Sequence, residues 1–122
     1  MNEQLEVLNM SIVEEARELM SDRFPMMVKY FLEDTQMYLE EIEKGVKENN
    51  AEIAISPAHT IKSSAKQLGA ERISDISRSI EEICRDIAEN GNTDDFPQFE
   101  KLYSELKEEI EAATPELTKL CS

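Results

Sequence analysis

His59 is the only histidine in the chain, and Lys62 and Lys66 follow it at intervals of one and two helical turns. The stretch from residue 53 to residue 70 contains no Asp or Glu, although the chain carries 27 acidic residues against 13 Lys and Arg. Imidazole is the side chain best suited to accept charge or a phosphoryl group near neutral pH. Lysines are natural counter-ions for phosphate. The pattern therefore predicts a site for an anion.

The helix expected around His59 has an apolar seam with spacing 4, 3, 4 and 3, formed by Ala54, Ala58, Ile61, Ala65 and Leu68. At about 100° of rotation per residue, His59 lies roughly 140° from the centre of this seam and points outward. Lys62 and Lys66 are turned the same way, so the three side chains are expected to form one ridge.

Glu81 is the leading candidate for a partner of the imidazole. It is about as far beyond the turn at Gly69 as His59 is before it, roughly 15 Å of helix on each side. In an antiparallel helix pair the two side chains then share the same outer surface. A carboxylate there is expected to accept a hydrogen bond from one imidazole nitrogen and leave the other as a nucleophile.

The periodicity predicts an all-α fold in a single domain that spans residues 1–122. We expect an antiparallel, up-down-up-down four-helix bundle with helices at about 24–49, 51–68, 71–90 and 96–113. A short N-terminal helix from Ser11 to about residue 21 precedes it, with Ser11 as the cap. Gly69 ends the second bundle helix, and a seam of Ile73, Ile76, Ile80, Ile83 and Ile87 defines the third.

Two prolines fall within the predicted helices. Pro57 is the first residue of a helix capped by Ser56, or it kinks a longer helix that starts at Asn50; the apolar face favours the longer helix. Thr114 and Pro115 are expected to interrupt the last helix.

Composition and charge narrow the classes of function. A net charge of -14 argues against direct nucleic-acid binding. No apolar run approaches the roughly 20 residues that a bilayer requires, and residues 1–6 do not resemble a signal peptide. Cys84 and Cys121 lie too far apart for a metal or redox motif, so we expect free thiols in a reducing cytoplasm. No cofactor is expected.

The segment from Ala58 to Ala70, AHTIKSSAKQLGA, resembles the phosphoacceptor motif of histidine phosphotransfer (HPt) domains. The resemblance implies a helical bundle in which His59 accepts a phosphoryl group from a receiver-domain aspartate and passes it to another. It implies a response regulator and a hybrid sensor histidine kinase as partners. Mg²⁺ is then expected on the receiver domain only, and the chain is expected to have no ATP site or autokinase activity.

The motif also implies roles for residues near His59. Lys62 and Lys66 offset phosphate charge, Ser63 replaces the usual glycine and keeps space for a partner, and Ser64 is small for packing. Docking is expected on an apolar patch formed by Ile55, Ile12, Met20 and Met27.

Other classes fit less well. A carboxylate-bridged metal bundle needs an acidic residue three positions before the histidine, where Ser56 stands. A haem site needs an inward histidine, whereas His59 is expected to point outward. A non-catalytic helical adaptor or inhibitor that binds a receiver or kinase stays open as the alternative. The chain is expected to be a monomer.

Overall fold

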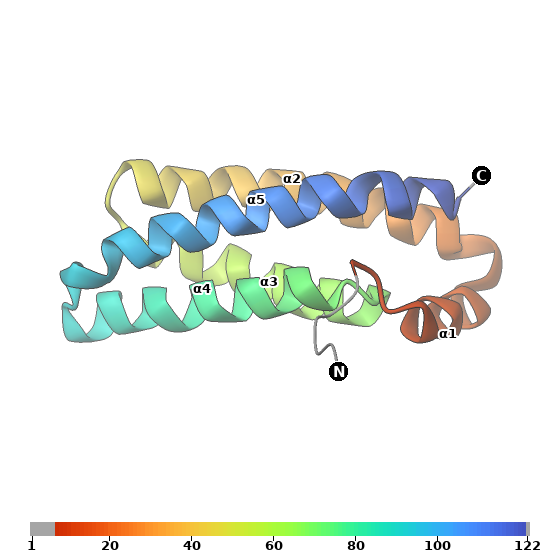
Figure 1. Ribbon diagram of the computed structural model, residues 1–122, viewed down its shortest axis with the longest axis horizontal. Helices are drawn as coiled ribbons and strands as arrows, with labels where there is room; N and C mark the ends of the chain where they lie inside the picture. Colours follow the sequence, from red (N-terminus) through yellow and green to blue (C-terminus); the bar gives the residue numbers. More distant parts are fainter. Residues whose placement is uncertain (1–6, 122) are drawn as a thin grey trace, which may run out of the picture.

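The computed structural model describes residues 7–121 and is built from helices (Figure 1). The elements in order are α1 (Met10–Met20), a 3₁₀ turn (Ser21–Arg23), α2 (Phe24–Lys47), α3 (Ala51–Leu68), α4 (Glu71–Asn90), a 3₁₀ turn (Thr93–Asp95) and α5 (Phe96–Lys119). No strand occurs among the described residues, and the prediction of an all-α fold is confirmed. The prediction about a signal peptide falls on residues 1–6, which lie outside the described part.

The four long helices lie side by side along the long axis, and α1 lies at the end where α2 begins (Figure 1). The seam predicted for α3 forms the centre of the core: Ala54, Ala58, Ile61, Ala65 and Leu68 are fully buried. Three of these five residues are alanine, and their small side chains allow α3 to pack closely against α2 and α4. His59 lies on the opposite, exposed side of α3, as the helical geometry predicts.

The buried face of α4 is rotated relative to the predicted isoleucine seam. Ile73, Ile80 and Ile87 are buried as expected, but Ile76 and Ile83 are only half-buried. Ser77 and Cys84 are fully buried in their place. Because α4 packs against both α3 and α5, its contact face is wide, and small residues occupy its centre.

Both helices with internal prolines continue through them. α3 starts after Asn50, whose side chain caps Glu52, and the prediction of one helix through Pro57 is confirmed. The predicted interruption of the last helix at Thr114 and Pro115 is wrong, because α5 runs to Lys119. Leu117, beyond the proline, is fully buried, and such burial stabilises by about 1.5–3 kcal/mol, which offsets much of the helix-breaking effect.

The first helix begins earlier than predicted. Asn9 rather than Ser11 is the cap of α1, and its side-chain oxygen accepts hydrogen bonds from the backbone N–H groups of Ser11 and Ile12. The backbone N–H of Asn9 also donates to the carbonyl of Gly69 at 2.7 Å. Gly69 ends α3 with a φ of 90°, so the start of α1 is fixed to the end of the helix that carries His59.

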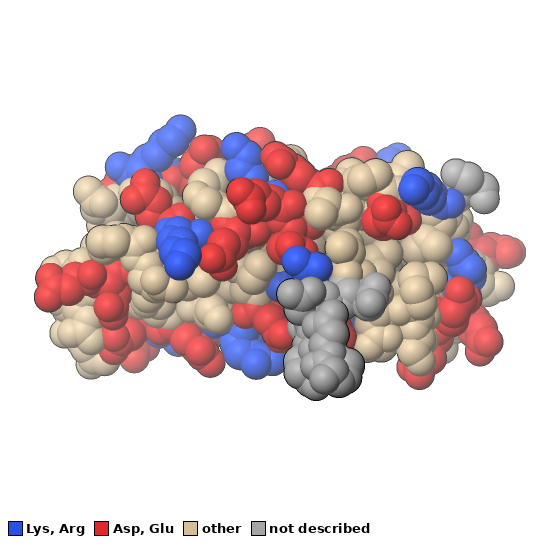
Figure 2. Space-filling model, in the orientation of Figure 1, with Lys and Arg blue, Asp and Glu red and all other residues tan. Residues whose placement is uncertain are grey.

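No helix in the described part of the chain has the length and apolar character needed to cross a membrane. Acidic side chains are spread over the face shown in Figure 2, with Lys and Arg side chains between them. An acidic surface of this kind supports solubility but identifies no binding site.

Candidate functional site

His59 projects from α3 with 56% of its side chain exposed, and its Nδ1 atom lies 3.1 Å from the Oε2 atom of Glu81 on α4. The predicted contact between these two residues is therefore present. When Nδ1 carries the proton and donates a hydrogen bond to Glu81, the lone pair of Nε2 is directed away from the carboxylate. That tautomer provides a nucleophilic nitrogen on the exposed side of the ring.

Glu81 is a buried carboxylate contacted by Lys62 and Arg85 as well as by His59. Lys62 Nζ donates to Oε1 at 2.8 Å, and Arg85 donates to Oε2 from Nη2 at 2.9 Å and from Nε at 3.2 Å. Burial raises the pKa of Glu81, but hydrogen bonds from Lys62, Arg85 and His59 outweigh it and lower the pKa to about 2. Glu81 is consequently ionised at neutral pH and fixed in place as an acceptor for the imidazole.

The turn between α3 and α4 brings these side chains together. Gly69 and Ala70 are the only residues between the two helices, so positions equally distant from the turn face one another. The hydroxyl of the buried Ser74 donates to the backbone carbonyl of Lys62 at 2.8 Å and links the helices. The sequence pattern did not predict this hydrogen bond, which fixes the position of Lys62 along the helix axis relative to α4.

Lys62 lies at the site but is engaged with Glu81 rather than unpartnered beside the ring. Lys66 is exposed one turn further along α3 and, within the described residues, makes no hydrogen bond or ion pair. Ser63 is exposed next to this ridge, where it leaves space above the helix. The Ser64 hydroxyl donates to the Thr60 carbonyl at 2.9 Å. The structure thus joins Glu81 and Lys62 to His59 but not Lys66.

Arg85 is a residue of this site that was not predicted from the sequence. It follows Glu81 by four residues, and this spacing alone favours an ion pair on one helical face. The signal was not distinctive in a chain with 27 acidic residues. Arg85 matters for the site because it contacts the same Oε2 atom of the buried Glu81 as His59 does.

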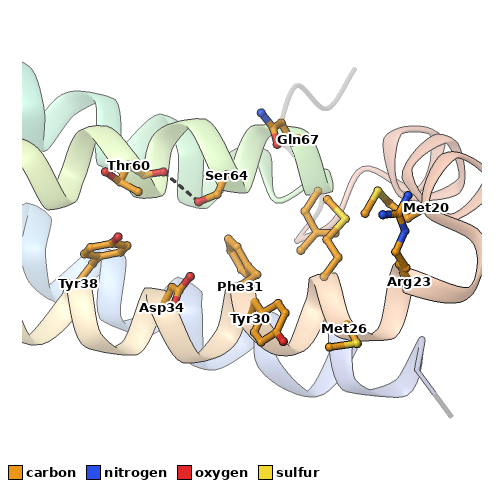
Figure 3. Close-up of a pocket in the computed structure, with 12 residues that line it drawn as sticks. Met20, Arg23, Met26, Tyr30, Phe31, Asp34, Tyr38, Thr60, Ser64 and Gln67 are labelled. Atoms are coloured by element: carbon orange, nitrogen blue, oxygen red, sulfur yellow. Dashed lines mark hydrogen bonds between the residues drawn. The ribbon is translucent and has the colours of Figure 1, made fainter.

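A groove of about 410 Å³ lies between α2 and α3 and reaches the residues next to His59 (Figure 3). We call it the methionine groove; it is lined by Met20, Arg23, Met26, Met27, Tyr30, Phe31, Asp34, Tyr38, Thr60, Ser64, Gln67 and Leu68. Met20 and Met27 belong to the predicted docking patch. The other two predicted members, Ile12 and Ile55, do not line the groove, and Ile55 packs against the core instead.

The described residues contain no group of three or more His, Cys, Asp and Glu side chains placed to hold a metal ion. Both cysteines are free thiols, and burial raises the pKa of Cys84 to about 12, so its thiol is protonated at neutral pH. The expected lack of a cofactor stays a prediction.

The lowered pKa of Glu81 predicts how acid affects stability. Because the pKa is about 2 in the folded state and 4.5 without partners, the contribution is complete above about pH 5, declines below 4.5 and is lost below about 2. Urea unfolding of the wild type and Glu81→Gln at pH 7 and pH 3 measures it. The stability difference between the two proteins is expected to shrink by about 1–2 kcal/mol at pH 3, since Lys62 and Arg85 are partly solvated. A constant difference would contradict the ionised cluster.

Comparison with known proteins adds two findings. A family model described as "Hpt domain" matches residues 26–114 of this chain. Among solved structures, the crystal structure of histidine-containing phosphotransfer protein B (HptB) from Pseudomonas aeruginosa PAO1 is similar, with a TM-score of 0.83 and 18% sequence identity. The alignment covers 97% of this chain and 96% of that protein. No curated protein matches the sequence. At this identity the structural match supports the helical fold, and the family match covers α3 and α4 completely.

Proposed function

The chain belongs to the HPt domain family, whose members carry phosphoryl groups in two-component phosphorelays, and we propose that His59 is its phosphoacceptor. The observation that carries this proposal is the exposed imidazole of His59, with Nδ1 at 3.1 Å from the buried, ionised Glu81. A histidine held in this way presents Nε2 to a partner while its other nitrogen stays fixed.

The reaction is an in-line transfer between a receiver aspartate and His59. The Nε2 lone pair attacks phosphorus, the P–N bond forms, and the P–O bond of the aspartyl phosphate breaks to release the carboxylate. Because Nδ1 keeps its proton, the phosphorylated ring carries a positive charge. The carboxylate of Glu81 stabilises this charge, and it does so more strongly in the phosphorylated state than with the neutral ring.

Basic residues near His59 reduce the repulsion between the phosphoryl group and an acidic protein. Lys62 is proposed to act directly, and Lys66 adds positive charge further along the ridge; each such exposed contact contributes on the order of 1 kcal/mol. Mg²⁺ is proposed to be supplied by the receiver domain, where it neutralises the transferring group. The protein is thus a phosphohistidine carrier without an ATP site or autokinase activity of its own.

The methionine groove is proposed as the docking surface for the receiver domain. Thr60 and Ser64, which lie on the α3 side of the groove, are the immediate neighbours of His59 and Ser63 in the chain (Figure 3). Met26 and Tyr30 are each about half exposed on the α2 side. Methionine side chains adapt to an apolar partner surface, and a partner bound here would reach the ring without crossing the bundle.

This docking surface predicts a difference between two similar methionines. Met26 and Met37 both lie on α2 with 49% exposure, but only Met26 lines the groove. Met26→Asp is expected to weaken binding of the receiver domain about ten-fold, because a charge must be desolvated at the contact. Met37→Asp adds the same charge outside the groove and serves as the control. Calorimetric titration measures both, and equal affinities for the two variants would exclude the groove as the contact.

The remaining features of the proposal concern assembly and location. HPt domains interact with receiver domains and kinases, and we propose a hybrid sensor histidine kinase and a response regulator as partners here. We further propose that residues 1–122 act as one domain and a cytoplasmic monomer. In the proposed arrangement, the helices run up-down-up-down with the short N-terminal helix at one end.

The alternative is a helical adaptor that binds a receiver or kinase without carrying phosphate. Incubation with a ³²P-labelled, phosphorylated receiver domain separates the two functions. A carrier takes up label that is acid-labile, stable in base and located on His59 by mass spectrometry. Binding of the receiver without any label on this chain would support the adaptor and overturn the proposal.

A further inference from the structure

Two anionic groups compete for the ammonium group of Lys62: the carboxylate of Glu81 and the phosphoryl group proposed for His59. In the unphosphorylated structure its Nζ atom lies 2.8 Å from Glu81 Oε1, and its side chain is only 27% exposed. In the proposed function, this ammonium also contacts the phosphoryl group on His59, which lies one turn earlier on α3. An ammonium has three N–H donors, but movement of Lys62 toward the phosphoryl group weakens its 2.8 Å contact with the buried carboxylate of Glu81.

An unpaired buried carboxylate is unfavourable. The phosphorylated ring gives Glu81 one positive partner at Oε2, but only once the P–N bond has formed. Departure of Lys62 during the transfer is therefore opposed unless Glu81 already has another cation. Arg85 is placed to be that cation. Its guanidinium contacts Oε2, whereas Lys62 contacts Oε1, so the two cations occupy different oxygens of one carboxylate. With 48% of its side chain exposed, Arg85 can follow small movements of the carboxylate while its charge stays close.

Building on the proposed function, we propose that Arg85 is a positioning residue of the phosphotransfer site: it holds Glu81 when Lys62 leaves that carboxylate for the phosphoryl group on His59. The cluster of Glu81, Lys62 and Arg85 has a net charge of +1 beside a neutral imidazole, within a chain of net charge -14. Without Arg85 the cluster is neutral, and Lys62 becomes the main cationic partner of the carboxylate. Arg85 thus acts through Glu81 and Lys62 and need not touch the phosphoryl group.

A double-mutant cycle with a small phosphodonor tests this coupling without any docking partner. Phosphoramidate transfers its phosphoryl group to Nε2 as its own P–N bond breaks and ammonia leaves. Lys62→Ala and Arg85→Ala are each expected to slow labelling of His59 about five-fold, the scale of one partly exposed charge contact. In the Arg85→Ala background, Lys62→Ala is expected to slow labelling less than about two-fold, because Lys62 no longer leaves Glu81.

Two further variants exclude unrelated effects of the substitution. Arg85→Lys keeps a cation and is expected to restore most of the rate. Arg78→Ala removes the same side chain two turns earlier on the same face of α4, where Arg78 pairs with Asp75, and is expected to leave the rate unchanged. An Arg78→Ala variant as slow as Arg85→Ala would overturn the proposal, because net charge alone would then explain the effect.

An NMR measurement reports on Lys62 directly and requires only the wild type and the Arg85→Ala variant. The ¹⁵Nζ resonance of Lys62 is expected to shift on phosphorylation of His59 in the wild type and to stay in place in Arg85→Ala. The role of Arg85 would be overturned if the rate effects of Lys62→Ala and Arg85→Ala multiplied in the double variant. It would also be overturned if the ¹⁵Nζ shift were the same in the wild type and in Arg85→Ala. If the wild type takes no label on His59, the proposed function fails and this inference fails with it. Labelling of the wild type without coupling rejects the inference alone.

Discussion

A His59→Gln variant is expected to take no phosphoryl label above background from either a phosphorylated receiver or phosphoramidate. Glutamine has no nucleophilic ring nitrogen, although its amide N–H can still donate to Glu81. The substitution therefore removes the reacting atom and leaves a polar side chain of similar length that can still donate a hydrogen bond. No other histidine is present in the chain that could take over as acceptor.

The fold and the docking surface are expected to survive this substitution. His59 is 56% exposed, and its described hydrogen bond is to Glu81, so the free energy of unfolding should change by no more than about 0.5 kcal/mol. Receiver affinity, measured by calorimetry, serves as the control. Acid-labile label on the variant would mean that the phosphoacceptor is not His59. Wild-type affinity together with lost label would separate binding from transfer.

The sequence predicted the helices and the outward direction of His59 well because both depend on local periodicity. The seam from Ala54 to Leu68 and the outward direction of His59 follow from 3.6 residues per turn, a geometry that tertiary contacts changed little. Glu81 was found because a two-residue turn fixes the register of α3 against α4. Such short-range constraints leave few alternatives for the direction of a side chain or for the register of two adjacent helices.

Prediction was weaker where an outcome depends on competing interactions. Pro115 was expected to end α5, but the burial of Leu117 beyond it favours continuation of the helix. Asn9 replaced Ser11 as the cap of α1 because its backbone is also held by Gly69, a contact 60 residues away in sequence. Periodicity in one segment carries no information about such long-range contacts.

The electrostatic arrangement of the site was also only partly predictable. Helical spacing placed Lys62 on the ridge beside His59, but spacing does not tell whether an amine faces a phosphate or a neighbouring carboxylate. Glu81 is a buried carboxylate that is stable only with cationic partners, and it binds Lys62 and Arg85 together. Lys66, one turn further along α3, is exposed and makes no such contact among the described residues.

Gly69 links the end of the helix that carries His59 to α1, and Gly69→Ala is expected to lower the free energy of unfolding by about 3 kcal/mol. The residue has a φ of 90°, a left-handed conformation that costs a side-chain-bearing residue about 1–2 kcal/mol. A Cβ atom would also lie 2.9 Å from the backbone oxygen of Asn9 and 3.1 Å from Cγ2 of Val13. Relief of these contacts would require α1 to move, at an additional cost of about 1–2 kcal/mol.

Gly91 supplies a matched control for this prediction, because it ends α4 with a φ of 71° and a Cβ there would meet nothing within 4 Å. Gly91→Ala therefore isolates the backbone strain and is expected to cost about 1 kcal/mol. Urea unfolding of both variants measures the difference, which reports the packing of α1 against the end of α3. Equal losses in the two variants would mean that α1 moves away from Gly69 at no cost. A larger loss at Gly69 would show that the glycine at the end of α3 also holds α1, the helix that borders the methionine groove through Met20.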